Sequence, residues 1–377
     1  MEEGSARRAT LREIAAAAGV AVSTASRVLA RSRQGLPPSS AAAERVLEIA
    51  RRANYEPDAQ AASLRSKQTH MLGVLVPHLT DVVLSTIYEG IDQAATELGY
   101  QTVVANTLDS PAEQRRRAEL LLSRRVDGLI LGDAHADSPF LAELAARGTP
   151  FVLVSRTHDG FDSVTADDYA GGRLVGTHLA DLGHRRIGII AGQPYASTGS
   201  ERTRGCLDAL AERGIDTPRD LVIHSAFDAD GGRTATLRLM RKKRPPTAIF
   251  AVNDMTAIGV MGTLRDLECK IGTDVAVIGF NDISIARDLP VPLSTVRSAL
   301  HQMGAEAARL LVARLRGETS DAPSQLRLPT ELVVRESSDP TVRTRGKSGR
   351  VPKKASPGHN GVPMQAPSRR PNRRAAQ

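Results

Sequence analysis

The sequence predicts an α/β protein in several parts: a three-helix head, a hinge segment, a body of two parallel-sheet α/β lobes, and a disordered basic tail. Three observations lead to this prediction. Two short helical patterns flank a glycine near the start, strand-like and helical segments alternate from His70 onward, and Pro, Ser, Gly, Lys and Arg dominate the last segment. The expected boundaries are 8–56 for the head, 57–69 for the hinge, 70–336 for the body and 337–377 for the tail.

The head begins with two helical patterns on either side of Gly19. Thr10 and Glu13 have the spacing of a capping box, which predicts that the first helix starts at Leu11. Gly19 interrupts the pattern, and a second helix is expected from near Val22. Two helices joined by a short glycine-containing turn are typical of the DNA-binding helix-turn-helix motif, whose second helix enters the major groove. From this stretch alone, an amphipathic helical hairpin of another kind fits equally well.

Side chains suited to reading base edges share the expected outer face of the second helix. One apolar contact, two hydroxyls and one guanidinium are offered there by Val22, Ser23, Ser26 and Arg27. Residues 31–38 are expected to form a loop that carries two arginines. A third helix over 41–53 then closes a small apolar core.

Charge is distributed unevenly along the chain. Residues 1–69 hold 11 Lys and Arg against 7 Asp and Glu, and residues 70–336 hold 29 against 34. A basic head on an acidic body indicates that the head contacts nucleic acid. Residues 337–377 hold 10 basic side chains against 1 acidic one. This tail either adds non-specific attraction to phosphate or acts only as a solubilising extension.

Several classes of protein are disfavoured. The chain has no signal-peptide core and no apolar run near the ~18 residues of a transmembrane helix, so a cytoplasmic protein without membrane contact is expected. Cys206 and Cys269 have no metal-binding spacing, and no Walker A loop, GxSxG elbow or HExxH motif is present. An aromatic content of 3% argues against stacking on single-stranded nucleic acid. We therefore expect no enzyme activity, no cofactor and no metal.

The body alternates strand-like and helical segments. Strands are expected at 71–77, 101–105, 126–131, 151–154, 186–191, 221–224, 248–252 and 275–279. Helices are expected at 83–98, 112–123, 139–146, 170–182, 201–213, 231–241, 256–266 and 301–316. This order predicts parallel sheets with helices on both faces, and the number of strands predicts two lobes. A ligand would then lie at the carboxyl ends of the strands, in the cleft between the lobes.

A short segment at 57–65 connects the head to the body. Pro57 ends the preceding structure, and Asp58 can cap a helix of barely two turns. A helix this short is marginal in water, so we expect it to form only when something stabilises it. A plain linker is the alternative.

Motifs in a fixed order give the chain a family resemblance. They are the run from Thr10 to Leu29, the Tyr55–Pro57–Leu64 pattern, RVDGLI at 125–130, LGHRRI at 182–187, ER…G at 201–205, VND…AIG at 252–259 and VIGFND at 277–282. Together they resemble the LacI/GalR family of bacterial transcriptional regulators, from about Thr10 to Glu336. The resemblance implies a LacI-type helix-turn-helix domain, a hinge helix and a sensor body of the periplasmic-binding-protein-like type I fold.

The resemblance also implies which residues contact DNA. Val22 and Ser23 match the positions that select operator bases, and Arg27 matches an arginine that reaches base edges. Leu64 matches a leucine that wedges into the minor groove and kinks it. Ala21 departs from the usual capping serine. Ala42 and Ala43 replace a frequent Thr-Arg pair at the third helix, and we expect Arg31 and Arg33 in the preceding loop to restore the phosphate attraction lost there. The full set of expected DNA contacts is Thr10, Val22, Ser23, Thr24, Ser26, Arg27, Arg31, Arg33, Ala61, Leu64 and Arg65.

In the body, the resemblance implies an effector cleft with a defined set of side chains. The set is Ser155, Arg156, Asp167, Arg202, Phe227, Asn253 and Asn281. Guanidinium and amide groups with an aromatic face suit a small polyol-like ligand. Asn253 could instead cap a helix, and Arg202 could pair with Glu201 or Asp208. Asn281 and Ser155 stand where sugar-binding members usually carry Asp, so an aldose or ketose is less assured.

The function that the resemblance implies is a homodimeric, allosteric transcriptional repressor. It would bind pseudo-palindromic double-stranded operator DNA and respond to a small, sugar-like effector. An activator or dual regulator of the same family is the first alternative. A sugar-binding transport component is the second, and the head, the hinge and the missing signal peptide argue against it.

Overall fold

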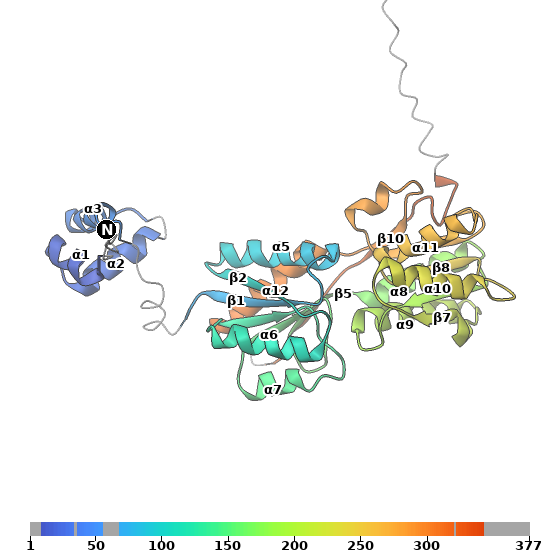
Figure 1. Cartoon of the computed structure of the whole chain (residues 1–377), viewed down its shortest axis with the longest axis horizontal. Helices are drawn as coiled ribbons and strands as arrows, with labels where there is room; N and C mark the ends of the chain where they lie inside the picture. Colours follow the sequence, from blue (N-terminus) through green and yellow to red (C-terminus); the bar gives the residue numbers. More distant parts are fainter. Residues whose placement is uncertain (1–8, 34–35, 56–67, 320–321, 343–377) are drawn as a thin grey trace, which may run out of the picture.

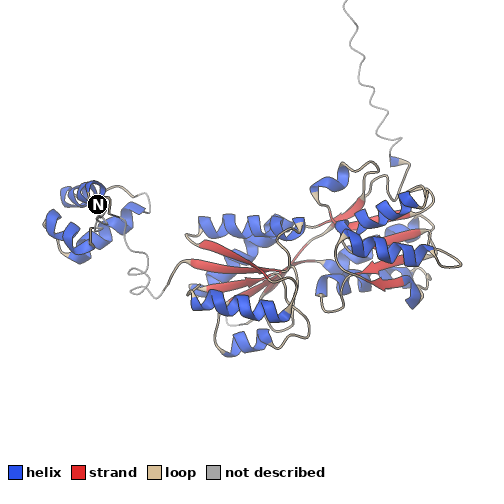
Figure 2. Ribbon diagram, in the orientation of Figure 1, coloured by secondary structure: helices blue, strands red, loops and turns tan. Residues whose placement is uncertain are grey.

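The computed structural model describes residues 9–33, 36–55, 68–319 and 322–342. They form a small helical head followed by two α/β lobes (Figure 1, Figure 2). The expected hinge residues 57–67 and the tail from 343 onward lie outside the described residues. Within the described part of the chain, no helix has the length and apolar character needed to cross a membrane.

The head packs three helices around a small core. They are α1 (Leu11–Ala18), α2 (Val22–Arg33) and α3 (Ala41–Arg52). The core consists of Ile14, Ala15, Ala18, Ala25, Val46 and Ala50. The capping box is confirmed, because the Thr10 hydroxyl accepts from Glu13 N and the Glu13 carboxylate accepts from Thr10 N. Gly19 ends α1 with a φ of 67°, a left-handed conformation that glycine adopts at little cost.

The loop expected at 31–38 begins later than predicted. α2 continues through Arg33, so Arg31 and Arg33 lie in its last turn and not in a loop. Arg and Ser are compatible with a helix, and the first residue after them that strongly disfavours one is Gly35. The two arginines therefore extend the helix that carries Val22 and Arg27.

The first lobe is a parallel sheet in the strand order β11-β5-β4-β3-β1-β2. Its strands are β1 (Met71–Val76), β2 (Gln101–Asn106), β3 (Gly128–Leu131), β4 (Phe151–Val154), β5 (Ser163–Ala166) and β11 (Gln325–Leu328). Its helices are α5 (Val82–Glu97), α6 (Pro111–Ser123), α7 (Phe140–Ala146) and α12 (Leu300–Leu315). α5 and α12 pack on each other and on the sheet, and α6 packs on β1.

The second lobe repeats this design in the order β12-β10-β9-β8-β6-β7. Its strands are β6 (Ile187–Ala191), β7 (Val222–His224), β8 (Ala248–Ala251), β9 (Ala276–Asn281), β10 (Ser294–Arg297) and β12 (Glu331–Val333). Its helices are α8 (Asp168–Asp181), α9 (Ser197–Glu212), α10 (Ala229–Met240) and α11 (Asp254–Asp266). All its strand pairings are parallel except that between β10 and β12.

The chain passes between the lobes after β5, after β10 and after β11. β5 leads into α8, β10 leads into α12, and β11 leads into β12. No strand is expected from the sequence at β5, β10, β11 or β12, because each of these strands is short and mixes polar with apolar residues. These crossovers are the segments that must bend when the lobes change their relative orientation.

Candidate functional site

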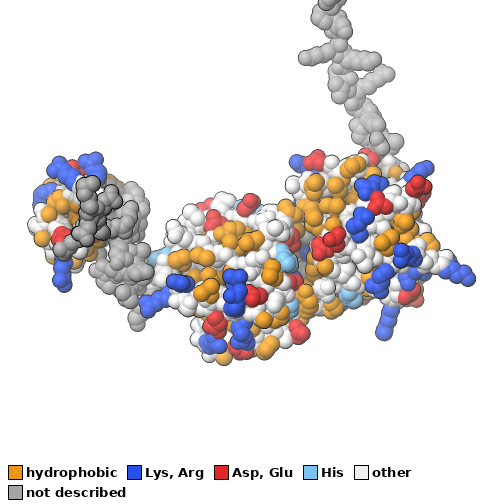
Figure 3. Space-filling view, viewed as in Figure 1, with side chains coloured by type: hydrophobic (Ala, Val, Ile, Leu, Met, Phe, Trp, Pro, Cys, Tyr) orange, Lys and Arg blue, Asp and Glu red, His pale blue; other side chains and the backbone are white. Residues whose placement is uncertain are grey.

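The outer face of α2 is open to solvent where the sequence predicts DNA contacts. Val22, Ser23 and Arg27 are exposed, whereas Ala25 is fully buried against the head core. Arg27 Nε donates to the carbonyl oxygen of Ser23 at 3.4 Å, which holds the guanidinium along the first turn. Arg side chains are also spread over the face of the head seen in Figure 3. The predicted base-reading face is therefore available to a partner.

The other predicted DNA contacts have varied settings. Thr24 and Ser26 are half-buried on the flanks of α2, and Arg31 is exposed. Thr10 is exposed and caps α1, so it has a structural role whatever else it touches. The hinge positions predicted to enter the minor groove, Ala61, Leu64 and Arg65, lie outside the described residues.

A cavity of about 580 Å³ lies between the two lobes. Loops and helix starts that follow the carboxyl ends of strands from both sheets form its walls. The predicted effector residues that line it are Ser155, Arg156, Arg202, Phe227, Asn253 and Asn281. Ligand sites commonly measure roughly 300–1,000 Å³. Residues far apart in the sequence, from both lobes, thus line one cavity of a size common for ligand sites.

Asp167 does not join this set. It lies at the crossover from β5 to α8, where its Oδ1 accepts from Ala170 N at 3.0 Å and caps α8. It is absent from the residues that line the cavity. Asp167 is therefore a helix cap that lies outside the lining of this cavity, and its contact with an effector stays a prediction.

Arg202 is anchored from behind the cavity wall. Its Nε donates to Asp168 Oδ1 at 2.7 Å, and its Nη1 donates to the carbonyl oxygen of Val252 at 2.7 Å. The guanidinium carbon lies 3.8 Å from the centre of the Phe280 ring. Gly172 allows α8 to approach this closely, since a Cβ there would lie 2.1 Å from the Arg202 carbonyl oxygen. Its acidic partner is therefore on α8, and not on its own helix as the sequence analysis considered.

Asn253 caps a helix and also lines the cavity, while its contact with an effector stays a prediction. Its Oδ1 accepts from Thr256 N at 2.8 Å and caps α11. Its Nδ2 donates to the carbonyl oxygen of Phe227 at 2.8 Å, and both residues line the cavity. The cap is confirmed, and the other end of the same side-chain amide holds the Phe227 backbone.

Unusual backbone conformations mark the cavity walls. Positive φ angles occur at Leu108 (55°), Asp109 (51°), Ser155 (67°) and Asn281 (108°). Each lies at or just beyond the carboxyl end of β2, β4 or β9, and all line the cavity. Non-glycine residues rarely adopt such angles, and they concentrate at functional sites.

A polar cluster that the sequence analysis missed joins the lobes beside the cavity. Asp109 accepts two hydrogen bonds from Arg156, at 2.7 and 2.9 Å, and one from the Tyr195 hydroxyl at 3.0 Å. His135 Nε2 lies 3.1 Å from Asp109 Oδ1, and its ring stacks on Tyr195 with centroids 4.0 Å apart. Burial opposes the Asp109 charge, but the bonds from Arg156 outweigh it and hold the pKa below its ordinary value. Tyr195 alone comes from the second lobe.

Two backbone amides complete this interlobe contact. Ala136 N donates to the carbonyl oxygen of Tyr195 at 3.0 Å, and Thr157 N donates to Ser197 Oγ at 2.9 Å. We use the term interlobe contact for the set Asp109, His135, Ala136, Arg156, Thr157, Tyr195 and Ser197. Because the partners lie in different lobes, these bonds hold the lobes in the arrangement seen here.

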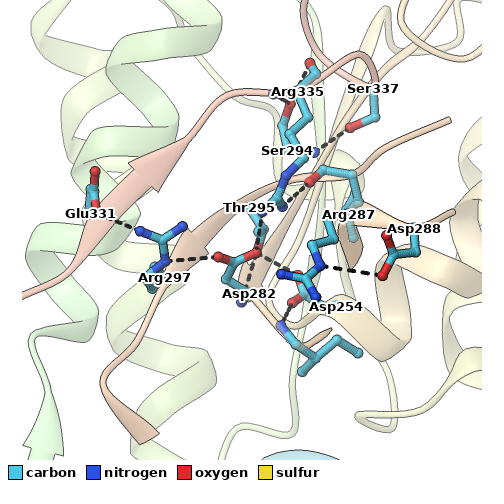
Figure 4. A network of polar contacts seen from close by, with 12 residues as sticks. Asp254, Asp282, Arg287, Asp288, Ser294, Thr295, Arg297, Glu331, Arg335 and Ser337 are labelled. Carbon is cyan, nitrogen blue, oxygen red and sulfur yellow. Dashed lines mark hydrogen bonds and ion pairs between the residues drawn. The ribbon is translucent and has the colours of Figure 1, made fainter. Parts of the chain in front are cut away.

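A second network connects the cavity wall to the crossovers (Figure 4). Asp282 accepts from Arg297 Nε at 2.9 Å and from Arg335 Nη2 at 2.7 Å. Arg297 ends β10, and its Nη1 donates to Glu331 at the start of β12 at 3.0 Å. Asp282 directly follows the cavity residue Asn281. These bonds therefore connect this wall to two of the segments that join the lobes.

Asp254 lies buried behind this network. It accepts from Thr295 Oγ1 at 2.5 Å and from Ile283 N at 2.8 Å. It thus connects the start of α11 to β10 and to the loop after β9. Burial raises the pKa of Asp254 to about 7.

Comparison with known proteins agrees with both halves of this architecture. Residues 10–58 match the model of bacterial regulatory proteins of the lacI family, and residues 177–338 match the periplasmic binding protein-like domain. HTH-type transcriptional regulator CelR of Thermobifida fusca is 33% identical over 340 residues, covering 88% of this chain and 98% of CelR. HTH-type transcriptional regulator DegA of Bacillus subtilis (strain 168) is 30% identical over 338 residues, covering 88% of this chain and 99% of DegA.

Solved structures extend the likeness to the whole arrangement of domains. The Lac repressor dimer bound to operator and the anti-inducer ONPF has a TM-score of 0.78 at 26% identity, over 88% of this chain and 100% of that one. The complex of transcriptional regulator CelR with cellobiose has a TM-score of 0.68 at 32% identity, with the same coverage. The relatives are named as transcriptional regulators and not as enzymes. With these matches in head and body, the chain belongs to the LacI family of bacterial regulatory proteins.

Proposed function

We propose that this protein is a homodimeric transcriptional repressor, acting in the cytoplasm on pseudo-palindromic operator DNA under the control of a small molecule bound between its lobes. The observation that carries the proposal is the presence, in one chain, of the open α2 face and an interlobe cavity of about 580 Å³. The Lac repressor is known as a dimer bound to operator, and relatives named PurR are transcriptional repressors.

The head would read one half of the operator. Val22, Ser23 and Arg27 lie together on the exposed face of α2, where an apolar side chain, a hydroxyl and a guanidinium can meet base edges. Arg31 and Arg33 follow on the last turn of the same helix and supply positive charge for phosphates. Two heads in a dimer would contact the two half-sites, about one helical turn of DNA apart.

The effector would be a small, sugar-like molecule. The cavity lining includes Asn253, Asn281, Ser155 and Phe227, which bring amides, a hydroxyl and an aromatic ring to it. Hydroxyl-rich ligands need such paired donors and acceptors beside an apolar surface. CelR forms a complex with cellobiose, which favours a sugar within the same family.

The effector would act by shifting a population of lobe arrangements. A ligand that prefers one arrangement changes the strain on the crossovers, which Asp282 connects to the cavity wall. The hinge segments of the two subunits would respond by joining or separating in the minor groove, where Leu64 would act as an apolar wedge.

The proposal is tested by fluorescence anisotropy with DNA from upstream of the chain's own reading frame. We expect saturable, salt-sensitive and sequence-selective binding, with affinity that changes when an effector from a thermal-shift screen of sugars, polyols and nucleosides is added. Leu64→Ala should weaken specific binding far more than non-specific binding, and equal loss on both would remove the wedge role. Absence of selective binding on all tested pseudo-palindromes would contradict the proposal.

Activation, or dual regulation, is the alternative within the same family. In vitro transcription from the bound promoter separates the two, because a repressor lowers transcript yield when it occupies its site and an activator raises it. The second alternative, a sugar-binding transport component, predicts ligand binding with no sequence-selective DNA binding.

A further inference from the structure

The two guanidinium groups that line the cavity already have acidic partners. Arg156 donates to both carboxylate oxygens of Asp109, at 2.7 and 2.9 Å, and these side chains are 7% and 15% exposed. Arg202 donates to Asp168 at 2.7 Å, and these side chains are 6% and 8% exposed. Paired and bidentate contacts of this kind consume the charge and the donor directions that a phosphate or carboxylate ligand would need.

Two further carboxylates line the cavity, and the exposed His78 is the remaining side chain of its lining that can become cationic. Asp81 and Asp228 line it, and their carboxylates cap α5 and α10 by accepting from Val83 N at 2.9 Å and Gly231 N at 2.7 Å. Those helix starts are therefore already satisfied. The start of α9, which has no side-chain cap, contributes at most about half a positive charge. Among the described lining residues, carboxylates thus outweigh the positive groups that remain available.

We propose that the cavity selects a ligand without net negative charge, and that Asp109 is the residue that sets this selectivity by neutralising Arg156. The inference rests on the proposed role of the cavity as the effector site, and it narrows the ligand class to unphosphorylated, non-carboxylate compounds. The cause is electrostatic: an anion entering the cavity meets acidic side chains and no unpaired guanidinium.

Asp109 is well placed for this role. The arginine holds the pKa of its carboxyl below the ordinary value, so it remains ionised at neutral pH. Tyr195 faces it from the other lobe, and burial raises the pKa of that phenol to about 12, so it stays a neutral donor. His135, at 3.1 Å, is the other titratable side chain bonded to the carboxylate. Removing the Asp109 charge would leave the Arg156 guanidinium at the cavity surface without its hydrogen-bonded carboxylate, with Asp81 and Asp133 as the nearby carboxyl groups.

The test uses the full chain and measures ligand affinity by calorimetry and thermal shift. The variants are wild type, Asp109→Asn, and the double variant Asp109→Asn/Arg156→Gln, which removes both charges. Unphosphorylated sugars and polyols are compared with their own monophosphates, and sulfate is titrated separately. Wild type should bind a parent compound at least ~10-fold more tightly than its monophosphate. Asp109→Asn should bind sulfate at least ~10-fold more tightly than wild type and the double variant do.

The measurements can contradict the proposed charge selectivity in two ways. A monophosphate that binds wild type more tightly than its parent overturns the inference, and so does equal sulfate affinity in the three proteins. The sulfate comparison stands even if no sugar binds, and the double variant accounts for sulfate held by the head or tail. If a neutral compound binds but leaves operator affinity unchanged, the proposed regulation fails while the charge selectivity stands. Asp109→Gln removes the same charge and replaces Asp109→Asn if that variant does not fold.

Discussion

Replacing Tyr195 with Phe removes the hydroxyl that donates to Asp109 from the opposite lobe at 3.0 Å. The Phe ring keeps the stack on His135, where the ring centroids are 4.0 Å apart. A hydrogen bond to a charged group contributes ~1.5–3 kcal/mol, and water entering the half-buried site offsets part of the loss, so the interlobe contact should weaken by about 1–2 kcal/mol. Since about 1.4 kcal/mol is tenfold, the lobes should separate roughly 5- to 30-fold more often.

Amide hydrogen exchange measures this separation directly. Ala136 N and Thr157 N donate to acceptors on the other lobe, so each exchanges when the lobes part. Tyr195→Phe should speed exchange at both amides by roughly 5- to 30-fold and leave the strands of each sheet unchanged.

The matched control is Tyr88→Phe. The Tyr88 hydroxyl lies 2.9 Å from Thr102 Oγ1, within the first lobe, so the same atom is removed without affecting the interlobe contact. Unchanged exchange at Ala136 and Thr157 in Tyr195→Phe, or equal acceleration in the control, would refute the reasoning.

Three further predictions concern packing, pH and DNA reading. Gly172→Ala places a Cβ 2.1 Å from the Arg202 carbonyl oxygen, so urea unfolding should show a loss of about 1–3 kcal/mol or more. Gly262→Ala, whose Cβ meets only a flexible Arg side chain at 3.1 Å, should show no such loss, and equal loss would contradict the packing argument. Burial raises the pKa of Asp254 to about 7, so its stabilising contribution is present at low pH and is lost as pH rises through about 7. Relative to Asp254→Asn, the free energy of unfolding of wild type should therefore fall between pH 5 and 8. A difference between the two proteins that stays constant over this range would contradict the raised pKa of Asp254. Arg27→Ala should weaken operator binding by ~1–3 kcal/mol in anisotropy titrations and relax selectivity at one base position, while the thermal shift by effector stays unchanged.

Much of the fold follows from local pattern. The capping box at Thr10 and the turn at Gly19 define α1 without any tertiary information, because both depend on neighbours a few residues away. The central strands are apolar runs buried in their sheets, so they stand out between amphipathic helices. The crossover strands do not stand out. Runs such as SVTA and STVR are recognisable as strands only through the sheet beside them.

Some residues of the cleft have a local sequence signal and others have none. Arg202 and Asn253 lie within motifs that a family resemblance identifies, and the fold brings them to one cavity. Asp109, His135 and Tyr195 carry no local signal, since each follows a different strand and neither spacing nor periodicity links them. They meet because parallel sheets gather the ends of their strands at one edge. Asp167 shows what the sequence cannot decide, because a carboxylate at this crossover can cap α8, as it does here, whether or not it also faces a cleft.

Asn281 and Asp282 are neighbours in the chain but make different contacts. Asn281 lines the cavity, while Asp282 binds Arg297 at the end of β10 and Arg335 just after β12. Under the proposed function, substitutions at position 281 would change which molecule is recognised and leave these bonds in place. Ligand specificity would thus be able to change, in evolution or in a designed biosensor, while the bonds that connect the cavity wall to the segments between the lobes stay the same.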